Sequence, residues 1–197
     1  MNLLSADEQD TQDMARLVGG HGPSLNDLME RHAEKLFHYL VRSLQNEADA
    51  ADIAQEAFAK VYQHSNKFDP NQKFTTWLYA IASNLVRDRY RWRSRHQQVS
   101  LDAENEQTES SLKETLRAAE PLPDQSLQTE ERAVVVRKAV AALPEELKQP
   151  LILAVYQDLP QAEIATILKC SVKAVETRIY RARQQLRTAL AGLMSSL

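Results

Sequence analysis

The chain has 197 residues, a net charge of −3 and 43% hydrophobic residues, a balance that is typical of globular proteins and excludes wholesale disorder. Glycine is scarce, at 4 residues, while Ala, Leu, Glu, Gln and Arg are abundant, which favours helices over sheets. There is no apolar run of about 18 residues, no signal-peptide pattern and only one cysteine, Cys170. We therefore expect an all-α, cytoplasmic protein with no direct membrane insertion.

The charges are distributed unevenly along the chain. Residues 73–96 contain one Lys and five Arg against one Asp, and residues 160–190 contain two Lys and four Arg against two Glu. Residues 102–131 contain nine acidic residues against one Lys and one Arg. The net charge therefore does not exclude nucleic-acid binding, because a local basic stripe is enough to bind phosphates.

The first part of the chain predicts a flexible lead-in followed by a helical domain. Residues 1–23 are polar and end in a turn rich in Gly and Pro, so we expect a flexible N-terminal segment there. Ser24 is a candidate N-cap, and apolar residues at helical spacing predict a first helix after it. A second helix begins near Glu47, and a third covers about 75–94. The apolar face of this third helix contains Trp77, Leu78, Ile81, Leu85 and Trp92.

The second part predicts a linker and another helical domain. Residues 97–128 are acidic and poor in apolar side chains, so we interpret them as a flexible linker with at most a transient helix near 111–119. A connection of that length favours two small domains, at 24–96 and 129–191. The second domain has four predicted helices, over 129–142, 145–157, 161–168 and 172–191. No strand pattern is present.

The most specific motif lies within 160–187. A short helix, a tight turn at Cys170 and Ser171, and a longer helix capped by Ser171 have helix-turn-helix spacing. Cys170 is most simply a small apolar residue packed in the turn. The outer face of the longer helix could reach base edges and phosphates in a major groove, or could be an ordinary solvated face. This face consists of Lys173, Glu176, Thr177, Tyr180, Arg181 and Gln184, and Arg183 flanks it where it could contact phosphates.

A second motif, Phe74–Arg95, interleaves aromatic residues with arginines. Asn84, Arg87 and Arg91 form a separate stripe on the predicted helix. Basic grooves with aromatic stacking platforms bind single-stranded nucleic acid. The alternative is that the tryptophans are core residues and the arginines only solubilise the helix end. Trp77 is a predicted core residue under either interpretation.

A third motif, Asp49–Phe58, has an acidic face that is either a docking surface for a basic partner or simply solvated. The chain has no Gly-rich phosphate loop, no paired Cys and His spacing and no nucleophile motif. Its five histidines are scattered along the sequence. We therefore predict a protein that is not an enzyme and that has no cofactor or metal.

The three motifs, in this order, resemble the extracytoplasmic-function (ECF) sigma factors of the sigma-70 family. The run DAADIAQEAFAKVY (49–62) resembles the second conserved helix of that family, and FTTWLYAIASNLVRDRYR (74–91) resembles its promoter-melting helix. The run ALPEELKQPLILAVYQDLPQAEIATILKCSVKAVETRIYRARQQL (142–186) resembles its fourth conserved region. Within the second run, the Trp-Leu-Tyr-x-Ile-Ala-x-Asn core is the most specific match.

The resemblance implies an alternative sigma factor that binds core RNA polymerase and directs promoter-specific initiation. It implies that Asp52, Gln55 and Glu56 dock on the clamp helices of the polymerase largest subunit, and that the second domain binds the flap. Asn84 corresponds to a family residue in the pocket for a flipped −10 base, which the loop 69–74 also lines. The −10 set contains Asn84, Arg87, Arg91, Lys73 and Phe74. The helix-turn-helix reads the −35 element, and an anti-sigma factor is an implied partner.

The reading helix departs from the family pattern at three positions. Many relatives have Gly where Lys173 stands, Thr where Ala174 stands and Arg where Glu176 stands. A glutamate accepts from cytosine or pairs with Lys173, and cannot donate to guanine. The DNA-binding role therefore carries over, whereas the particular −35 sequence does not.

Two functions of other classes are alternatives to a sigma factor. An ordinary helix-turn-helix regulator would need a sensor or dimerisation domain, and it would leave Phe74–Arg95 without a function. A sigma-mimicking adaptor that sequesters an anti-sigma factor usually carries a phospho-receiver domain, and no such domain is visible in this sequence.

Overall fold

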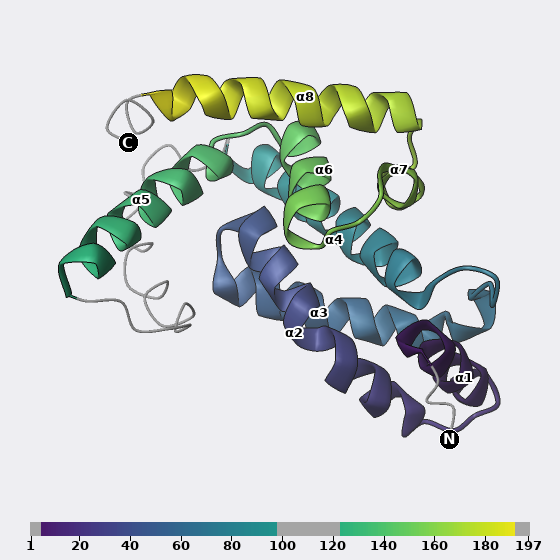
Figure 1. Cartoon of the computed structure of the whole chain (residues 1–197). Helices are drawn as coiled ribbons and strands as arrows, with labels where there is room; N and C mark the ends of the chain where they lie inside the picture. Colours follow the sequence, from purple (N-terminus) through teal and green to yellow (C-terminus); the bar gives the residue numbers. More distant parts are fainter. Residues whose placement is uncertain (1–4, 98–122, 192–197) are drawn as a thin grey trace.

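The structure, a computed structural model, describes residues 5–97 and 123–191, and all regular elements in these ranges are helices (Figure 1). They are α1 (Ala6–Val18), α2 (Ser24–Leu44), α3 (Glu47–Gln63), the short 3₁₀ helix η1 (Ser65–Lys67), α4 (Phe74–Gln97), α5 (Pro123–Ala141), α6 (Glu145–Tyr156), α7 (Gln161–Leu168) and α8 (Val172–Ala189). The predicted all-α class is confirmed. None of the helices described is both long and apolar enough to cross a lipid bilayer.

Helices α2, α3 and α4 form a bundle around a shared apolar core. Leu28, Leu36 and Leu40 of α2 are fully buried, and they recur at intervals of two turns and one turn along one face. Helix α3 begins after Asn46, whose side chain accepts a hydrogen bond from the backbone N–H of Asp49 at 2.8 Å. Ser24 was expected as the N-cap of α2 but is its first helical residue, and its hydroxyl lies 3.0 Å from His21 Nδ1.

Helices α6, α7 and α8 form the second unit, with bounds close to those predicted. Lys169 ends α7 in the left-handed region, at φ 52°, and Ser171 caps α8 by accepting from the N–H of Ala174 at 3.1 Å. The predicted cap and turn are therefore confirmed, and Cys170 is partly buried against the core as expected. Helix α5 begins at Pro123, earlier than predicted, and residues 98–122 of the predicted linker lie outside the described residues.

The first helix, α1, differs from the flexible segment expected over residues 1–23. Ser5 and Glu8 form a capping box, in which Ser5 Oγ accepts from the Glu8 N–H and the Glu8 carboxylate accepts from the Ser5 N–H at 2.8 Å. Met14 and Leu17 are buried, so α1 covers part of the core formed by α2 and α4. A sequence this polar folds here because its few apolar residues meet a surface made by later helices.

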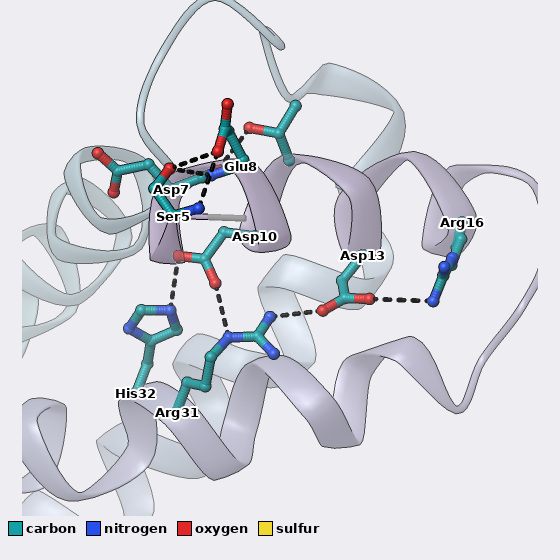
Figure 2. A network of polar contacts seen from close by, with 9 residues as sticks. Ser5, Asp7, Glu8, Asp10, Asp13, Arg16, Arg31 and His32 are labelled. Carbon is teal, nitrogen blue, oxygen red and sulfur yellow. Dashed lines mark hydrogen bonds and ion pairs between the residues drawn. The ribbon is translucent and has the colours of Figure 1, made fainter. Parts of the chain in front are cut away.

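Charged side chains also join α1 to α2 (Figure 2). Asp10, which is 1% exposed, accepts from Arg31 Nε at 2.9 Å and lies 2.7 Å from His32 Nε2. Asp13 accepts from Arg31 Nη2 at 2.5 Å and lies 3.6 Å from Arg16. A buried carboxylate is stable only when it is paired and hydrogen-bonded, and here both acids are. Asp10 and Asp13 of α1 are therefore part of the fold.

The two helical units pack on each other and share one continuous hydrophobic core. In Figure 1, α6 and α7 lie between α8 and the bundle of α2, α3 and α4. Helix α6 contacts α2, and α7 contacts α4. The hydroxyl of Tyr39 on α2 contacts Gln149 Oε1 on α6 at 3.4 Å, although 110 positions separate them in sequence. Some contacts of this interface are made by predicted DNA-binding residues, for example by Lys73 with Glu163.

Candidate nucleic-acid interface

Helix α8 carries one predicted DNA-binding surface. Val175, Ile179 and Ala182 are buried at about one-turn spacing against α6 and α7, so the opposite face points to solvent. That face includes five exposed members of the predicted −35 set and one half-buried member, Thr177. The exposed members are Lys173, Glu176, Tyr180, Arg181 and Arg183. The structure therefore brings the predicted set onto one accessible surface.

Two residues on this surface bind each other. Lys173 Nζ lies 2.9 Å from Glu176 Oε2, and the side chains are 82% and 54% exposed. This pairing is one of the two roles expected for Glu176 from the sequence. An exposed pair one turn apart contributes about 0.5 kcal/mol or less, so an incoming base or phosphate can displace it.

Helix α4 carries the second predicted surface. Arg87 Nη1 donates to Asn84 Oδ1 at 3.3 Å, and both residues are half-buried. Arg91 is exposed and lies 3.7 Å from Asp88. The predicted Asn84, Arg87 and Arg91 stripe therefore exists, but only its C-terminal end is fully open to solvent.

Two further arginines of α4 have a structural role. Arg89 Nη1 donates to one oxygen of Asp49 at 2.7 Å, and Arg93 Nη2 donates to the other. Asp49 is only 16% exposed and belongs to the first turn of α3. These two ion pairs, one on each oxygen of Asp49, hold the second half of α4 on α3. Part of the basic motif therefore stabilises the fold.

Phe74, the first residue of α4, is a core residue. It is 1% exposed, and its ring packs against Phe68 and Trp77, each at 6.4 Å, and against His32 at 5.2 Å. This corrects its assignment to the DNA contact set. A Phe at a helix start is apolar enough to fill the space beneath a loop, and the sequence does not reveal which way it points.

Lys73, the neighbour of Phe74, points outward and is bound by another helix. Its Nζ lies 2.8 Å from Glu163 Oε1 on α7 and 4.0 Å from Asp7 on α1. Thr76 Oγ1 donates to the second oxygen of Glu163 at 3.4 Å. Residues 70–73 also line an open hollow together with the first half of α1.

Most aromatic residues of this motif are not stacking platforms. Tyr79 is buried and donates to Gln157 Oε1 at 2.6 Å, while Tyr90 donates to the backbone carbonyl of Ser43. Trp77 is partly buried against the core, as predicted. Trp92, by contrast, is 51% exposed and stacks on His96 at 4.4 Å. Its predicted place in the apolar face is wrong, because about half of this side chain is open to solvent among the described residues.

The acidic motif on α3 is accessible. Asp52, Gln55 and Glu56 are all exposed, while the adjacent Ile53 and Ala57 are buried. Glu56 lies 3.4 Å from Lys60, one turn later. The predicted docking residues therefore share one solvent-facing surface.

Two charged residues of α6 lie between the units and were missed by sequence reasoning. Burial raises the pKa of Glu145, against the opposing effect of Arg87 and Arg91. Burial likewise lowers the pKa of Lys148, which is 4% exposed and places its Nζ 5.6 Å from the centre of the Tyr90 ring. No local pattern could have identified these residues, because their partners lie far away in the sequence.

Comparisons with known proteins match both units. Residues 28–96 match the family Sigma-70 region 2, and residues 131–186 match Sigma-70, region 4. The chain is 34% identical over 175 residues to the ECF RNA polymerase sigma factor SigW of Bacillus subtilis, covering 88% of this chain and 92% of that protein. It is 31% identical over 191 residues to the RNA polymerase sigma-H factor of Pseudomonas aeruginosa, covering 95% and 96%.

Solved structures give the same result for the fold. CnrH in complex with the cytosolic domain of CnrY matches with a TM-score of 0.67 and 25% identity, over 93% of this chain and 98% of that one. The sigma factor RpoE of Bartonella quintana, solved with the anti-sigma factor NepR, matches with a TM-score of 0.66 and 19% identity, over 86% and 98%. The resemblance in the three motifs is thus confirmed over most of the chain. This protein belongs to the ECF group of the sigma-70 family, whose members are transcription initiation factors and not enzymes.

Proposed function

We propose that this chain is an alternative sigma factor that reads a −35 element with α8 and opens DNA at the −10 element with α4. The observation that carries the proposal is the outer face of α8. Six side chains able to contact bases or phosphates lie there on a capped helix, and the helix-turn-helix turn precedes it. Such a helix fits a major groove, and the buried stripe on its other side fixes its orientation.

The stripe on α4 supports the second half of the proposal. Asn84 has an amide that can hydrogen-bond a flipped base, and Arg87 and Arg91 supply positive charge for the strand. Flipping a base costs a few kcal/mol, least at an easily unstacked step, so the promoter sequence itself contributes selectivity.

Partners follow from the surfaces and from the family. Asp52, Gln55 and Glu56 form the surface that we assign to the clamp helices of core polymerase, and we assign the flap to the second unit. An anti-sigma factor is a further proposed partner, because the similar RpoE was solved in complex with the anti-sigma factor NepR. The departures at Lys173 and Glu176 leave the preferred −35 sequence specific to this chain.

Run-off transcription tests the proposal directly. Core RNA polymerase is mixed with this protein across promoter fragments from its own genome, and core polymerase alone is the control. We expect new promoter-specific starts only when the protein is present. If core polymerase gains no such start, the sigma-factor function is wrong.

A second experiment tests the role of Asn84. Asn84→Ala should slow open-complex formation, measured by permanganate footprinting, while binding to core polymerase in gel filtration stays intact. Asp52→Ala is the matched variant with the opposite expectation, because its exposed carboxylate lies on the docking surface. Equal loss of both activities in Asn84→Ala would place this residue in folding.

A further inference from the structure

The start of α8 presents a positive and a negative side chain next to each other in solvent. Lys173 Nζ lies 2.9 Å from Glu176 Oε2, and the two side chains are 82% and 54% exposed. The buried stripe of α8 lies on another face of the helix and begins at Val175. An exposed pair one turn apart adds little to stability, so the fold does not depend on this contact.

The pair lies in the part of α8 that would face bases. Ser171 caps the helix by accepting from the N–H of Ala174 at 3.1 Å, so Lys173 and Glu176 belong to its first two turns. In helix-turn-helix proteins, the N-terminal residues of the second helix contact base edges in the major groove. Thr177 Oγ1 donates to the Lys173 carbonyl at 2.8 Å, so its hydroxyl proton is engaged within the helix. The pair therefore supplies the free charged groups at this end.

Both members of the pair keep hydrogen-bonding capacity for a ligand. A lysine ammonium has three N–H donors, and a carboxylate has two oxygens with about four acceptor sites. The contact between Lys173 Nζ and Glu176 Oε2 uses one of the donors and one of the oxygens. The pair thus offers a donor and an acceptor side by side, and a ligand can bind both groups without separating them.

A G·C base pair has the complementary groups on its major-groove edge. Guanine O6 is an acceptor there and cytosine N4 is a donor, and the two atoms share a Watson–Crick hydrogen bond of about 2.9 Å. Lys173 Nζ and Glu176 Oε2 have the same spacing, 2.9 Å. Lys173 can donate to O6 and to the neighbouring acceptor N7, while Glu176 accepts from N4.

The other three base pairs fit less well when the helix holds the two charges in a fixed order. A T·A pair presents thymine O4 and adenine N6 in the same order, but a methyl group replaces the second acceptor beside the lysine. C·G and A·T pairs reverse the order, so they place an amino group against Lys173 and a carbonyl oxygen against Glu176. The expected order of affinity is G·C, then T·A, then the two reversed pairs.

We propose that Lys173 and Glu176 bind one G·C base pair of the −35 element as a unit, with the lysine on guanine and the glutamate on cytosine. This inference rests on the proposed function, in which α8 lies in the major groove. It assigns the sequence preference at one position to two side chains. The contacts with phosphates are left to the flanking arginines, such as the exposed Arg183.

Selection from random duplexes tests the base preference. The full chain, bound to core RNA polymerase, is mixed with short duplexes that contain a random stretch, and the bound duplexes are sequenced. Core polymerase alone is the control. One position of the enriched motif should follow the order G·C, T·A, reversed pairs. In anisotropy titrations with four duplexes that differ only at this position, the Kd for C·G should be about tenfold higher than for G·C.

An exchange of the two charges tests which residues set this preference. The double variant Lys173→Glu with Glu176→Lys keeps the net charge and reverses the order of donor and acceptor. It should prefer C·G over G·C at the same position. The matched control is Glu34→Lys with Lys35→Glu, an exchange between two exposed residues of α2, and it should keep the wild-type preference. Circular dichroism verifies that each variant keeps its helices.

A single substitution adds a milder test of the same contact. Glu176→Gln keeps an acceptor for cytosine N4 but adds a donor and removes the negative charge. It should therefore tolerate a carbonyl oxygen better, and the difference in Kd between G·C and C·G should become smaller. An unchanged difference would contradict the role of the glutamate.

The same measurements distinguish base reading from other roles of the pair. A wild-type motif that the charge exchange leaves unchanged would overturn the inference, and the sigma-factor function would stand. An equal loss of affinity for all four base pairs would also overturn it, because the pair would then contact phosphates. If the wild-type complex enriches no motif beyond that of core polymerase alone, the inference and the proposed −35 recognition both fail.

Discussion

Helices α4 and α8 are both rich in arginine and both predicted to contact DNA, but their surfaces are in different states. Within the described part of the chain, most of the outer face of α8 is exposed, and Lys173 pairs there with Glu176. Several basic groups at α4 are already engaged: Arg89 and Arg93 by Asp49, and Lys73, just before the helix, by Glu163. A basic helix predicted from sequence therefore offers several side chains for binding. The fold decides which of them stabilise the protein and which remain available to a ligand.

The two arginine-rich helices differ in how they are packed in the fold. On α8 a single buried stripe fixes the helix, and the remaining side chains are left over for a partner. On α4 the helix is packed against α3, α2 and α7, so its arginines and tyrosines also serve these neighbours. We expect substitutions on α4 to affect folding more than substitutions on α8, and the following predictions test this contrast.

The largest effect is expected at Phe74. Phe74→Ala should lower the free energy of unfolding by about 3–5 kcal/mol, because it leaves a cavity beneath Phe68 and Trp77. The measurement is urea denaturation followed by circular dichroism. The neighbouring variant Lys73→Ala should lose less than about 1 kcal/mol, because its pair with Glu163 is half-exposed. Similar losses in both would contradict the assignment of Phe74 to the core.

Alkaline pH should weaken the fold through the tyrosines at the interface. Burial raises the pKa of Tyr39 to about 12, and burial also raises the pKa of Tyr90 above its usual value of 10.0. The unfolded chain then releases these protons first, so stability is fully present below pH 10 and falls as the pH rises toward 12. For Tyr39 alone the loss approaches about 3 kcal/mol.

The measurement is urea denaturation across this pH range. Tyr39→Phe is the control variant, and it should show a flatter decline because one raised pKa is removed. A decline equally steep in that variant would assign the alkaline sensitivity to other groups.

A smaller loss of stability is expected at Asp49. Asp49→Ala should reduce the free energy of unfolding by about 2–3 kcal/mol, because it removes the carboxylate that pairs Arg89 and Arg93 in a largely buried place. Asp52→Ala, three residues later and exposed, should leave stability unchanged and weaken binding to core polymerase. The two variants together separate the buried side of α3 from its docking side.

The smallest expected effect on folding is at Arg181. Arg181→Ala should weaken binding to −35 duplex DNA by about 1–3 kcal/mol, measured by fluorescence anisotropy, with no change in the urea midpoint. Arg89→Ala is the matched arginine on α4, and it should do the reverse, since its guanidinium binds Asp49. A loss of stability in Arg181→Ala would mean that α8 is also committed to the fold.

The sequence by itself determined the helical class, most helix bounds, the Ser171 cap and the composition of the α8 face. These depend on local patterns: apolar spacing, capping residues and turn residues close together in the chain. The same kind of signal existed for α1, since Ser5 and Glu8 have capping-box spacing, but the acidic composition of the segment concealed it. The three motifs were also enough to identify the family.

Only the tertiary structure decided which side chains of these helices remain available for binding. Phe74 became core, Trp92 became exposed, and Arg89 and Arg93 became anchors, although all four belong to one predicted motif. The contact between Lys73 and Glu163 joins residues 90 positions apart, so no local pattern contains it. Helical periodicity states which residues share a face. What covers that face depends on the rest of the chain.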